Sequence, residues 1–155
     1  MSGRSDRGSV SVEVTILAPA FLSLIVLAGV AGRTAIAAEA IDSAAHHAAR
    51  AASISRDADS AEAAARRAAR EQLDWSGLSC TGAPAVTFTG SVEGRPATFD
   101  DAFDSAVGES SAVTVRVTCT VSFTDLNLPA IPGMPTRRTV TAAFTSPLDR
   151  YRSRP

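Results

Sequence analysis

Residues 14–32 are VTILAPAFLSLIVLAGVAG, nineteen consecutive positions without a charged side chain. An α-helix rises about 1.5 Å per residue, so this stretch is close to the minimum that crosses the roughly 30 Å hydrocarbon core of a bilayer. Only Thr15 and Ser23 carry a polar group, whereas a helix packed on a globular core normally shows a polar face. Pro19 bends a helix but is tolerated in lipid. The sequence therefore predicts a membrane-spanning helix, assigned to residues 9–33.

The charges beside the apolar run predict its orientation. The N-terminal flank MSGRSDRG at residues 1–8 carries Arg4 and Arg7 against the single acid Asp6, and Arg33 follows the run. Because basic residues favour the cytoplasmic side, the N-terminus is expected in the cytoplasm and the chain after Arg33 outside it. The predicted product is a single-pass cell-membrane protein with an extracytoplasmic C-terminal domain.

Glu13 stands at the edge of the apolar run, five positions after Gly8. A carboxylate deep in lipid costs about 2–3 kcal/mol and less near the interface, so its plainest interpretation is a headgroup-level residue without a role. However, a basic leader, Gly8, four uncharged residues, Glu13 and an apolar helix together resemble the class III signal of type IV pilins and pseudopilins. The resemblance implies a leader at residues 1–8 and cleavage between Gly8 and Ser9 by a prepilin peptidase that leaves the helix in place.

The stretch RGSVSVEVTILAPAFLSLIVLAGVAGR at residues 7–33 is similar, more narrowly, to the start of TadE/TadG-like minor pseudopilins of tight-adherence pilus systems. The shared positions are Gly8, Val12, Glu13, Pro19 and Arg33. The major pilins of these systems carry an aromatic residue after the glutamate, so valine at position 14 favours a minor subunit. The resemblance implies a role in pilus assembly and adhesion at the cell envelope, and incorporation into an extracellular pilus. The implied partners are other pilin or pseudopilin subunits, a prepilin peptidase, the inner-membrane assembly platform and the lipid bilayer.

The resemblance suggests a physical role for Glu13 in contacts between subunits. Cleavage after Gly8 leaves an ammonium group on Ser9, and a carboxylate one helical turn further along pairs with the ammonium of a neighbouring subunit in a medium of low dielectric constant. We predict that Glu13 sets the axial register between subunits. Small residues that permit close approach of helices lie at Ala18, Ala28, Gly29 and Gly32.

Residues 34–76 contain neither proline nor glycine and are rich in alanine, arginine and glutamate, which predicts a helical stalk. Weaker helix formers at residues 55–60 predict a kink or short break, with Asp59 and Glu62 as a capping box for a second helix. Glu62 and Arg66 are spaced for an ion pair. The predicted apolar face comprises Ile36, Ile41, Ala44, Ala48, Ala52 and Ile54. The predicted polar face comprises Glu39, Asp42, His46 and Arg50.

Residues 77–147 carry strand patterns at 85–92, 112–124 and 138–145. Strict alternation in the second of these places Val113, Val115, Val117 and Cys119 on the core side. The last strand is expected to turn Val140, Ala142 and Phe144 inward, after a loop that contains Pro129, Pro132, Gly133 and Pro135. A polar tail is assigned to residues 148–155, with Arg150, Arg152 and Arg154 in solvent. The predicted fold class is α+β, a long N-terminal helix packed on a small antiparallel β-sheet of three strands.

Cys80 and Cys119 are the only cysteines, with neither the CxxC spacing nor the nearby histidines of a zinc site. A disulfide is predicted, since the segment is expected to be exported. A bridge across a loop of this length restricts the unfolded chain by about 4 kcal/mol on the entropic model. It is expected to join the exit of the helix to the central strand.

Other functions find little support. A net charge of -1 and a pI near 6.1 give no field for nucleic acid. His46 and His47 are adjacent and point about 100 degrees apart on a helix, so they cannot hold one metal ion together. Asp100, Asp101 and Asp104 lack the alternation of a calcium loop, which leaves calcium binding open. No catalytic set is recognisable, and we predict a protein that is not an enzyme and has no cofactor.

Two alternatives remain open beside the pilus subunit. One is a membrane-anchored extracytoplasmic binding module that enters no filament. The other is a secreted soluble protein, because Ala35, Ile36 and Ala37 satisfy the A-x-A rule of ordinary signal peptidase. Glu13 and the length of the apolar run argue against secretion.

Overall fold

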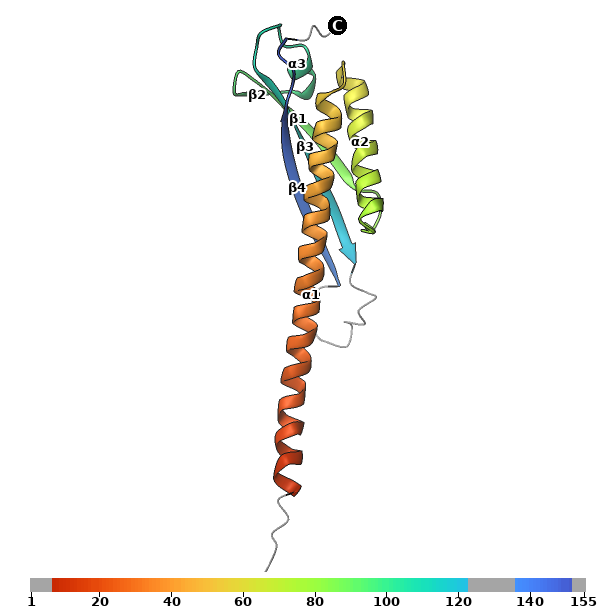
Figure 1. Ribbon diagram of the computed structural model, residues 1–155, viewed down its shortest axis with the longest axis vertical. Helices are drawn as coiled ribbons and strands as arrows, with labels where there is room; N and C mark the ends of the chain where they lie inside the picture. Colours follow the sequence, from red (N-terminus) through yellow and green to blue (C-terminus); the bar gives the residue numbers. More distant parts are fainter. Residues whose placement is uncertain (1–6, 123–135, 152–155) are drawn as a thin grey trace, which may run out of the picture. The chain divides into compact units, whose positions relative to one another are not determined.

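The computed structural model describes residues 7–122 and 136–151, with side chains described from residue 13 onward (Figure 1). The chain divides into two compact units, unit 1 at Met1–Ala35 and unit 2 at Ile36–Pro155. The boundary falls inside helix α1 (Arg7–Ser53). The remaining elements are α2 (Ala58–Trp75), β1 (Ala85–Val92), β2 (Arg95–Ala97), α3 (Phe99–Phe103), β3 (Ser111–Ser122) and β4 (Arg137–Pro147). A long N-terminal helix and a small antiparallel sheet confirm the predicted α+β class.

Unit 1 is helical throughout its described part, and most of its described side chains are exposed. Ile16 is 70% exposed and Ile25 67%. Two of its hydroxyl groups are paired within the helix. The Ser23 hydroxyl donates to the Pro19 carbonyl oxygen at 2.8 Å. The Thr34 hydroxyl donates in the same way to Val30, also at 2.8 Å. Such internal pairing is what a helix in hydrocarbon requires, since lipid offers no partner for a polar group.

Unit 2 begins with a helical hairpin, whereas the sequence predicted a stalk with a kink or short break. The predicted break is present at residues 54–57, but α2 then runs back beside α1, so that the Gln72 side-chain amide donates to the Ser43 hydroxyl at 3.1 Å (Figure 1). The predicted cap was wrong. Asp57 caps α2 by accepting the Ser60 backbone N–H at 2.8 Å, while Asp59 lies in the first turn. Hydrogen bonds from the backbone and side chain of Ser60 lower the pKa of Asp57.

Alanine makes the close packing of this hairpin possible. The buried residues of the two helices are almost all alanine, and Ile41 and Leu73 are the larger exceptions. Ile41, Ala44, Ala48 and Ala52 are fully buried as predicted, and the predicted polar face is exposed. Ile36 and Ile54 contradict the prediction, each with 66% of its surface exposed. The reason is their position, because Ile36 is the first residue of unit 2 and Ile54 lies in the turn between the helices.

The sheet has four antiparallel strands in the order β2-β1-β3-β4, one more than predicted. The missed strand β2 has only three residues, one of them a proline, and it pairs with β1 through a tight turn at Glu93 and Gly94. Both turn residues have positive φ, of 51° and 73°, as the type I′ hairpin turn requires. The predicted strand at 85–92 matches β1, and the other two agree with β3 and β4 to within two residues wherever they are described.

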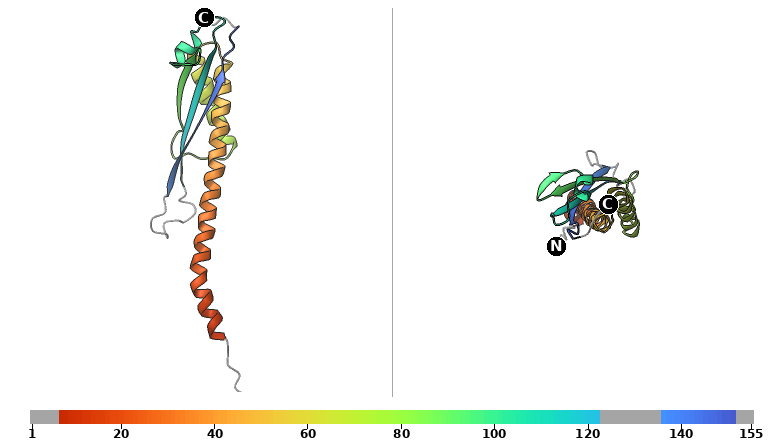
Figure 2. Two further views of the ribbon diagram at one scale, coloured as in Figure 1. Left: turned by 90° about the vertical axis from the view of Figure 1, so that its left-hand side faces the viewer. Right: turned by 90° about the horizontal axis from the view of Figure 1, so that it is seen from above.

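One face of the sheet packs on the helices and the other is open. Figure 2 shows α2 and the second half of α1 on a single face. The alternation predicted for β3 is confirmed, and β4 pairs with it so that Cys119 faces Val140 and Val115 faces Phe144. The open face carries hydrogen-bonded threonine pairs from β3 and β4, which are Thr114–Thr145, Thr118–Thr141 and Thr120–Thr139.

Two predicted segments have limited structural description. The predicted proline-containing loop lies outside the described residues apart from its last positions, and so do Arg152 and Arg154 of the tail. The polar tail begins later than predicted. Leu148 is only 6% exposed, and its backbone N–H donates to the Ser111 carbonyl at 2.9 Å, so the folded domain extends beyond residue 147.

Gly90 of β1 lies under α3, where no larger residue fits. A Cβ atom built at position 90 would overlap the carbonyl oxygen of Thr98 and stand 2.8 Å from Cβ of Ala102. We expect Gly90→Ala to lower the free energy of unfolding by about 1–3 kcal/mol, as overpacking of a tight contact does. Thermal unfolding of the detergent-solubilised chain, followed by circular dichroism, measures the effect. Thr89→Ala, on the open face, is the matched control, and equal melting temperatures would refute the expectation.

Candidate functional site

The predicted processing site and the predicted register residue lie together in the first turns of α1. The backbone is helical from Arg7, so Gly8 and Ser9 fall within α1, and Glu13 follows Ser9 by four residues. Positions four apart are neighbours on one face of a helix. The helix therefore gives Ser9 and Glu13 the spacing that the register hypothesis needs, while cleavage itself stays a prediction.

Glu13 presents its carboxylate to the surroundings. Its side chain is exposed and forms no hydrogen bond or ion pair with any residue that the structure describes. It is followed directly by the exposed apolar residues, beginning with Val14 at 59% exposure and Ile16 at 70%. A carboxylate at the edge of an apolar surface that has no partner among the described residues is costly in lipid, and it gains most from a cation supplied by another molecule.

The apolar surface that follows Glu13 extends over several helical turns. Among the described residues, the helix at Glu13–Ser53 is the one candidate membrane span, and none of its most apolar window is buried inside the protein. Gly29 and Gly32 lie within this surface, and a Cβ atom built on either would meet nothing within 4 Å. The helix backbone is thus accessible at these two positions, as close packing against another helix requires.

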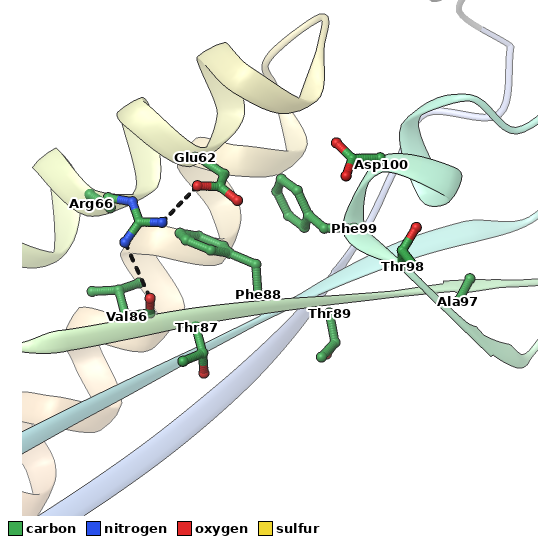
Figure 3. A pocket seen from close by; sticks show the side chains of 10 residues that line it. All are labelled: Glu62, Arg66, Val86, Thr87, Phe88, Thr89, Ala97, Thr98, Phe99 and Asp100. Atoms are coloured by element: carbon green, nitrogen blue, oxygen red, sulfur yellow. Dashed lines mark hydrogen bonds and ion pairs between the residues drawn. The ribbon is translucent and has the colours of Figure 1, made fainter.

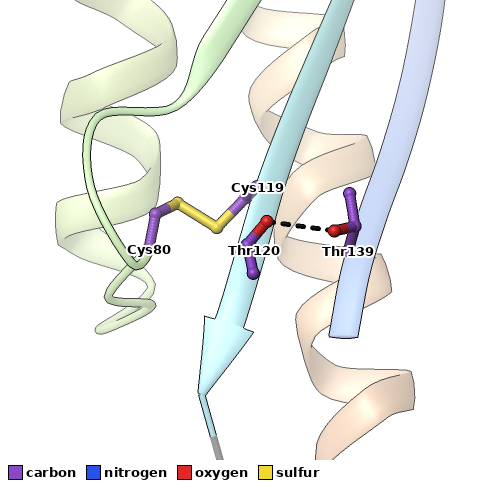
Figure 4. The surroundings of a disulfide bond; sticks show 4 residues. All are labelled: Cys80, Cys119, Thr120 and Thr139. Carbon is purple, nitrogen blue, oxygen red and sulfur yellow. Dashed lines mark hydrogen bonds between the residues drawn. A yellow bond between two sulfur atoms is a disulfide. The ribbon is translucent and has the colours of Figure 1, made fainter. Parts of the chain in front are cut away.

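The predicted disulfide between Cys80 and Cys119 is confirmed (Figure 4). The bridge closes a separation of 39 residues, with the two Cα atoms 5.4 Å apart. Cys80 lies just beyond the end of α2 and also forms a β-bridge with Val121. The Thr81 backbone N–H donates to the Thr120 carbonyl at 2.7 Å. The chain leaving α2 is therefore fixed to the inner strand β3, as predicted.

An open groove of about 600 Å³ lies between α2, β1 and α3 (Figure 3). The Arg66 guanidinium lies 4.7 Å from the centre of the Phe88 ring, and that ring contacts Phe99 at 5.0 Å between centroids. Arg66 also pairs with Glu62 at 2.6 Å, which confirms that predicted pair, and donates to the Val86 carbonyl at 3.3 Å. These contacts are internal to the chain, so Arg66 has a structural role in the wall of the groove.

The groove was not predicted, although one signal pointed to it. The alternation of β1 turns Val86 and Phe88 toward the helices, which implies an apolar contact on that side. Its partner Phe99 belongs to α3, a five-residue helix too short to show a periodic pattern. Thr98 caps α3 by accepting the Asp101 backbone N–H at 3.1 Å, in a capping box that sequence reasoning also missed.

The side chains considered for metal binding have other surroundings. The structure shows Asp101 accepting the Thr98 backbone N–H at 3.2 Å, and hydrogen bonds from the side chain and backbone of Thr98 lower the pKa of Asp101. His46 and His47 are exposed, and the His46 ring packs edge-on against Phe144 at 4.4 Å. Within residues 7–122 and 136–151, no group of three or more His, Cys, Asp or Glu side chains is placed to hold a metal ion.

Comparison with known proteins gives one family for the N-terminal segment. Residues 8–50 match the model of the family described as TadE-like protein. No curated protein and no solved structure matches the chain. The matched residues include Gly8, Glu13, Pro19 and Arg33, on which the resemblance seen in the sequence depends. Over residues 8–50 the chain is therefore similar to TadE-like proteins.

Proposed function

We propose that the chain is a minor pilin-like subunit that takes part in assembling a tight-adherence pilus at the cell envelope. The observation that carries the proposal is the position of Glu13. It is an exposed carboxylate at the head of an apolar helix, four residues after Ser9 and inside the TadE-like segment. In the proposed topology the N-terminus is cytoplasmic, the apolar run spans the bilayer, and unit 2 lies outside the cytoplasm.

The proposed mechanism needs no catalytic chemistry in the chain. A prepilin peptidase cleaves after Gly8, and the new ammonium of Ser9 pairs with Glu13 of a neighbouring pilin or pseudopilin subunit. Inside the membrane this pair is worth far more than at a surface, because water does not screen it. Accessible backbone at Gly29 and Gly32 lets helices approach closely during assembly on an inner-membrane platform.

The alternative is a membrane-anchored binding module outside any filament. The groove lined by Phe88 and Phe99 favours it, because concave surfaces with aromatic walls are the usual sites for small ligands. The two proposals make different demands on the N-terminus. A pilus subunit requires cleavage after Gly8, whereas an anchored binding module keeps its first residues.

The N-terminal residue of the mature protein, measured by mass spectrometry of the membrane fraction, tests the proposal. We expect Ser9 at the N-terminus in cells that contain a prepilin peptidase, and an intact leader in cells that lack it. A chain that begins at Met1 or Ser2 in both strains supports the plain anchor. A chain in the culture fluid that begins at Ala38 means secretion and contradicts both proposals.

A further inference from the structure

The end of unit 2 at which α1 enters carries an unusual exposed residue. Because α2 runs back beside α1, Trp75 at the end of α2 lies at the same end of unit 2 as Ile36. Trp75 is the single tryptophan of the chain and is 84% exposed, and Ile36 is 66% exposed. Two large apolar side chains are thus left uncovered at this end by the part of the chain that the structure describes.

The sheet brings two cations to the same end. Cys80 follows Trp75 by five residues and forms a β-bridge with Val121, which is paired with Arg138 of β4. Arg137, the next residue along, faces Ser122 at the end of β3. Both arginines are exposed. We call Ile36, Trp75, Arg137 and Arg138 the basal cluster.

The basal cluster has the composition of a membrane-interface surface. An indole ring combines a large apolar body with one N–H donor, and tryptophan accordingly gathers where hydrocarbon meets headgroups. Arginines near such a surface are attracted to anionic headgroups. Ile36 follows Gly32, the last residue of the apolar run, by four residues, about 6 Å of helical rise. The chain itself therefore keeps this end close to the boundary of the proposed span.

We propose that the basal cluster binds the surface of the bilayer in which the apolar run is embedded. The Trp75 indole enters the interfacial layer, and Arg137 and Arg138 lie against anionic lipid phosphates. Glu71 and Asp74 on the last turn of α2 are exposed too and oppose this attraction, so the indole carries more of the binding than the arginine pair. The inference rests on the proposed membrane span, and it adds that unit 2 has a defined lipid-contacting end.

Because Trp75 is the sole tryptophan, its fluorescence reports its own surroundings without labelling. The test reconstitutes the full chain into vesicles of phosphatidylethanolamine and phosphatidylglycerol and confirms insertion by flotation. We expect aqueous acrylamide to quench Trp75 several-fold less than the same residue in a Trp75→Phe/Tyr151→Trp variant. Tyr151 is 81% exposed and follows Arg150, whose carbonyl accepts the Gly108 N–H, so it reports a different region of unit 2. Lipids brominated near the carbonyl end of the acyl chain should quench Trp75 and leave the control unchanged.

The outcomes distinguish the proposed lipid contact of the basal cluster from the proposed membrane span on which it rests. A chain that floats with the vesicles while acrylamide quenches Trp75 as strongly as the control overturns the lipid contact and leaves the span intact. A chain that does not float overturns both. For the cations, Arg137→Gln/Arg138→Gln should raise acrylamide quenching of Trp75 in vesicles with anionic lipid and leave it unchanged in pure phosphatidylcholine. Arg116→Gln, on the open face of the sheet, is the matched control, and an equal effect of the two changes argues against a role for the arginine pair.

Discussion

Replacing Glu13 with alanine is expected to abolish pilus assembly while the protein still inserts into the membrane. The carboxylate forms no hydrogen bond or ion pair with any described residue of its own chain, so its removal takes no polar interaction that the structure shows from the folded monomer. In the assembled state, by contrast, the substitution leaves a Ser9 ammonium of the neighbouring subunit without its partner. An uncompensated charge of this kind costs about 3 kcal/mol or more, which corresponds to a loss of affinity of roughly 100-fold per contact.

Counting pili by electron microscopy, together with quantitative detection of the subunit in sheared filaments and in membranes, measures the effect. Glu39→Ala is the matched control, because Glu39 is also an exposed glutamate of α1 but lies in unit 2. Glu13→Asp keeps the charge on a shorter side chain and should recover part of the assembly. Normal piliation with Glu13→Ala would rule out the register role, whereas loss of the protein from the membrane fraction would show that the residue acts earlier than assembly.

The parts of the fold that the sequence predicted are those with a strong repeating signal. Unbroken alternation over residues 112–122 identified the inner strand β3 and placed Cys119 on its core side. The disulfide was predicted separately, from two cysteines without a zinc pattern in a segment expected to be exported. The apolar run without charges identified the candidate span, and Glu13 with Gly8 led to the family that the comparison confirms for residues 8–50. Local pattern was sufficient for β3 because burial on one face leaves a periodic trace, and for the candidate span because a long run without charges is itself a local signal.

The parts that the sequence did not predict depend on contacts between distant residues. Weak helix formers at residues 55–60 indicate a break equally well whether the chain bends or reverses. Reversal is accompanied by complete burial of alanines on α2, such as Ala61 and Ala65, which the sequence alone does not reveal. Likewise β2 and α3 are too short for a periodic signal, and the position of α3 depends on the absence of a side chain at Gly90. The groove at Phe88 and Phe99 exists only once α3 is in place.

Loss of the disulfide is expected to produce the largest change in the stability of unit 2. In a Cys80→Ser/Cys119→Val variant, the unfolded chain regains the freedom that a closed loop spanning 39 positions had removed. The entropic model puts this at about 4 kcal/mol, which for a domain of this size lowers the melting temperature by on the order of 15 °C. Chemical and thermal unfolding of the detergent-solubilised chain, followed by circular dichroism with and without a reducing agent, measures it.

The choice of substitutions separates the bridge from the packing around it. Cys119 is 2% exposed, so valine keeps an apolar group of similar size where serine would bury a hydroxyl, whereas Cys80 is only partly buried and tolerates serine. Reduction of the unmodified protein should lower its stability to that of the double variant, and the double variant itself should not respond to reducing agent. If the bridge were merely a passive consequence of packing, the reduced and oxidised forms would unfold together. In that case two backbone contacts would be enough to hold the chain leaving α2 against β3. They are the β-bridge between Cys80 and Val121 and the hydrogen bond from the Thr81 N–H to the Thr120 carbonyl.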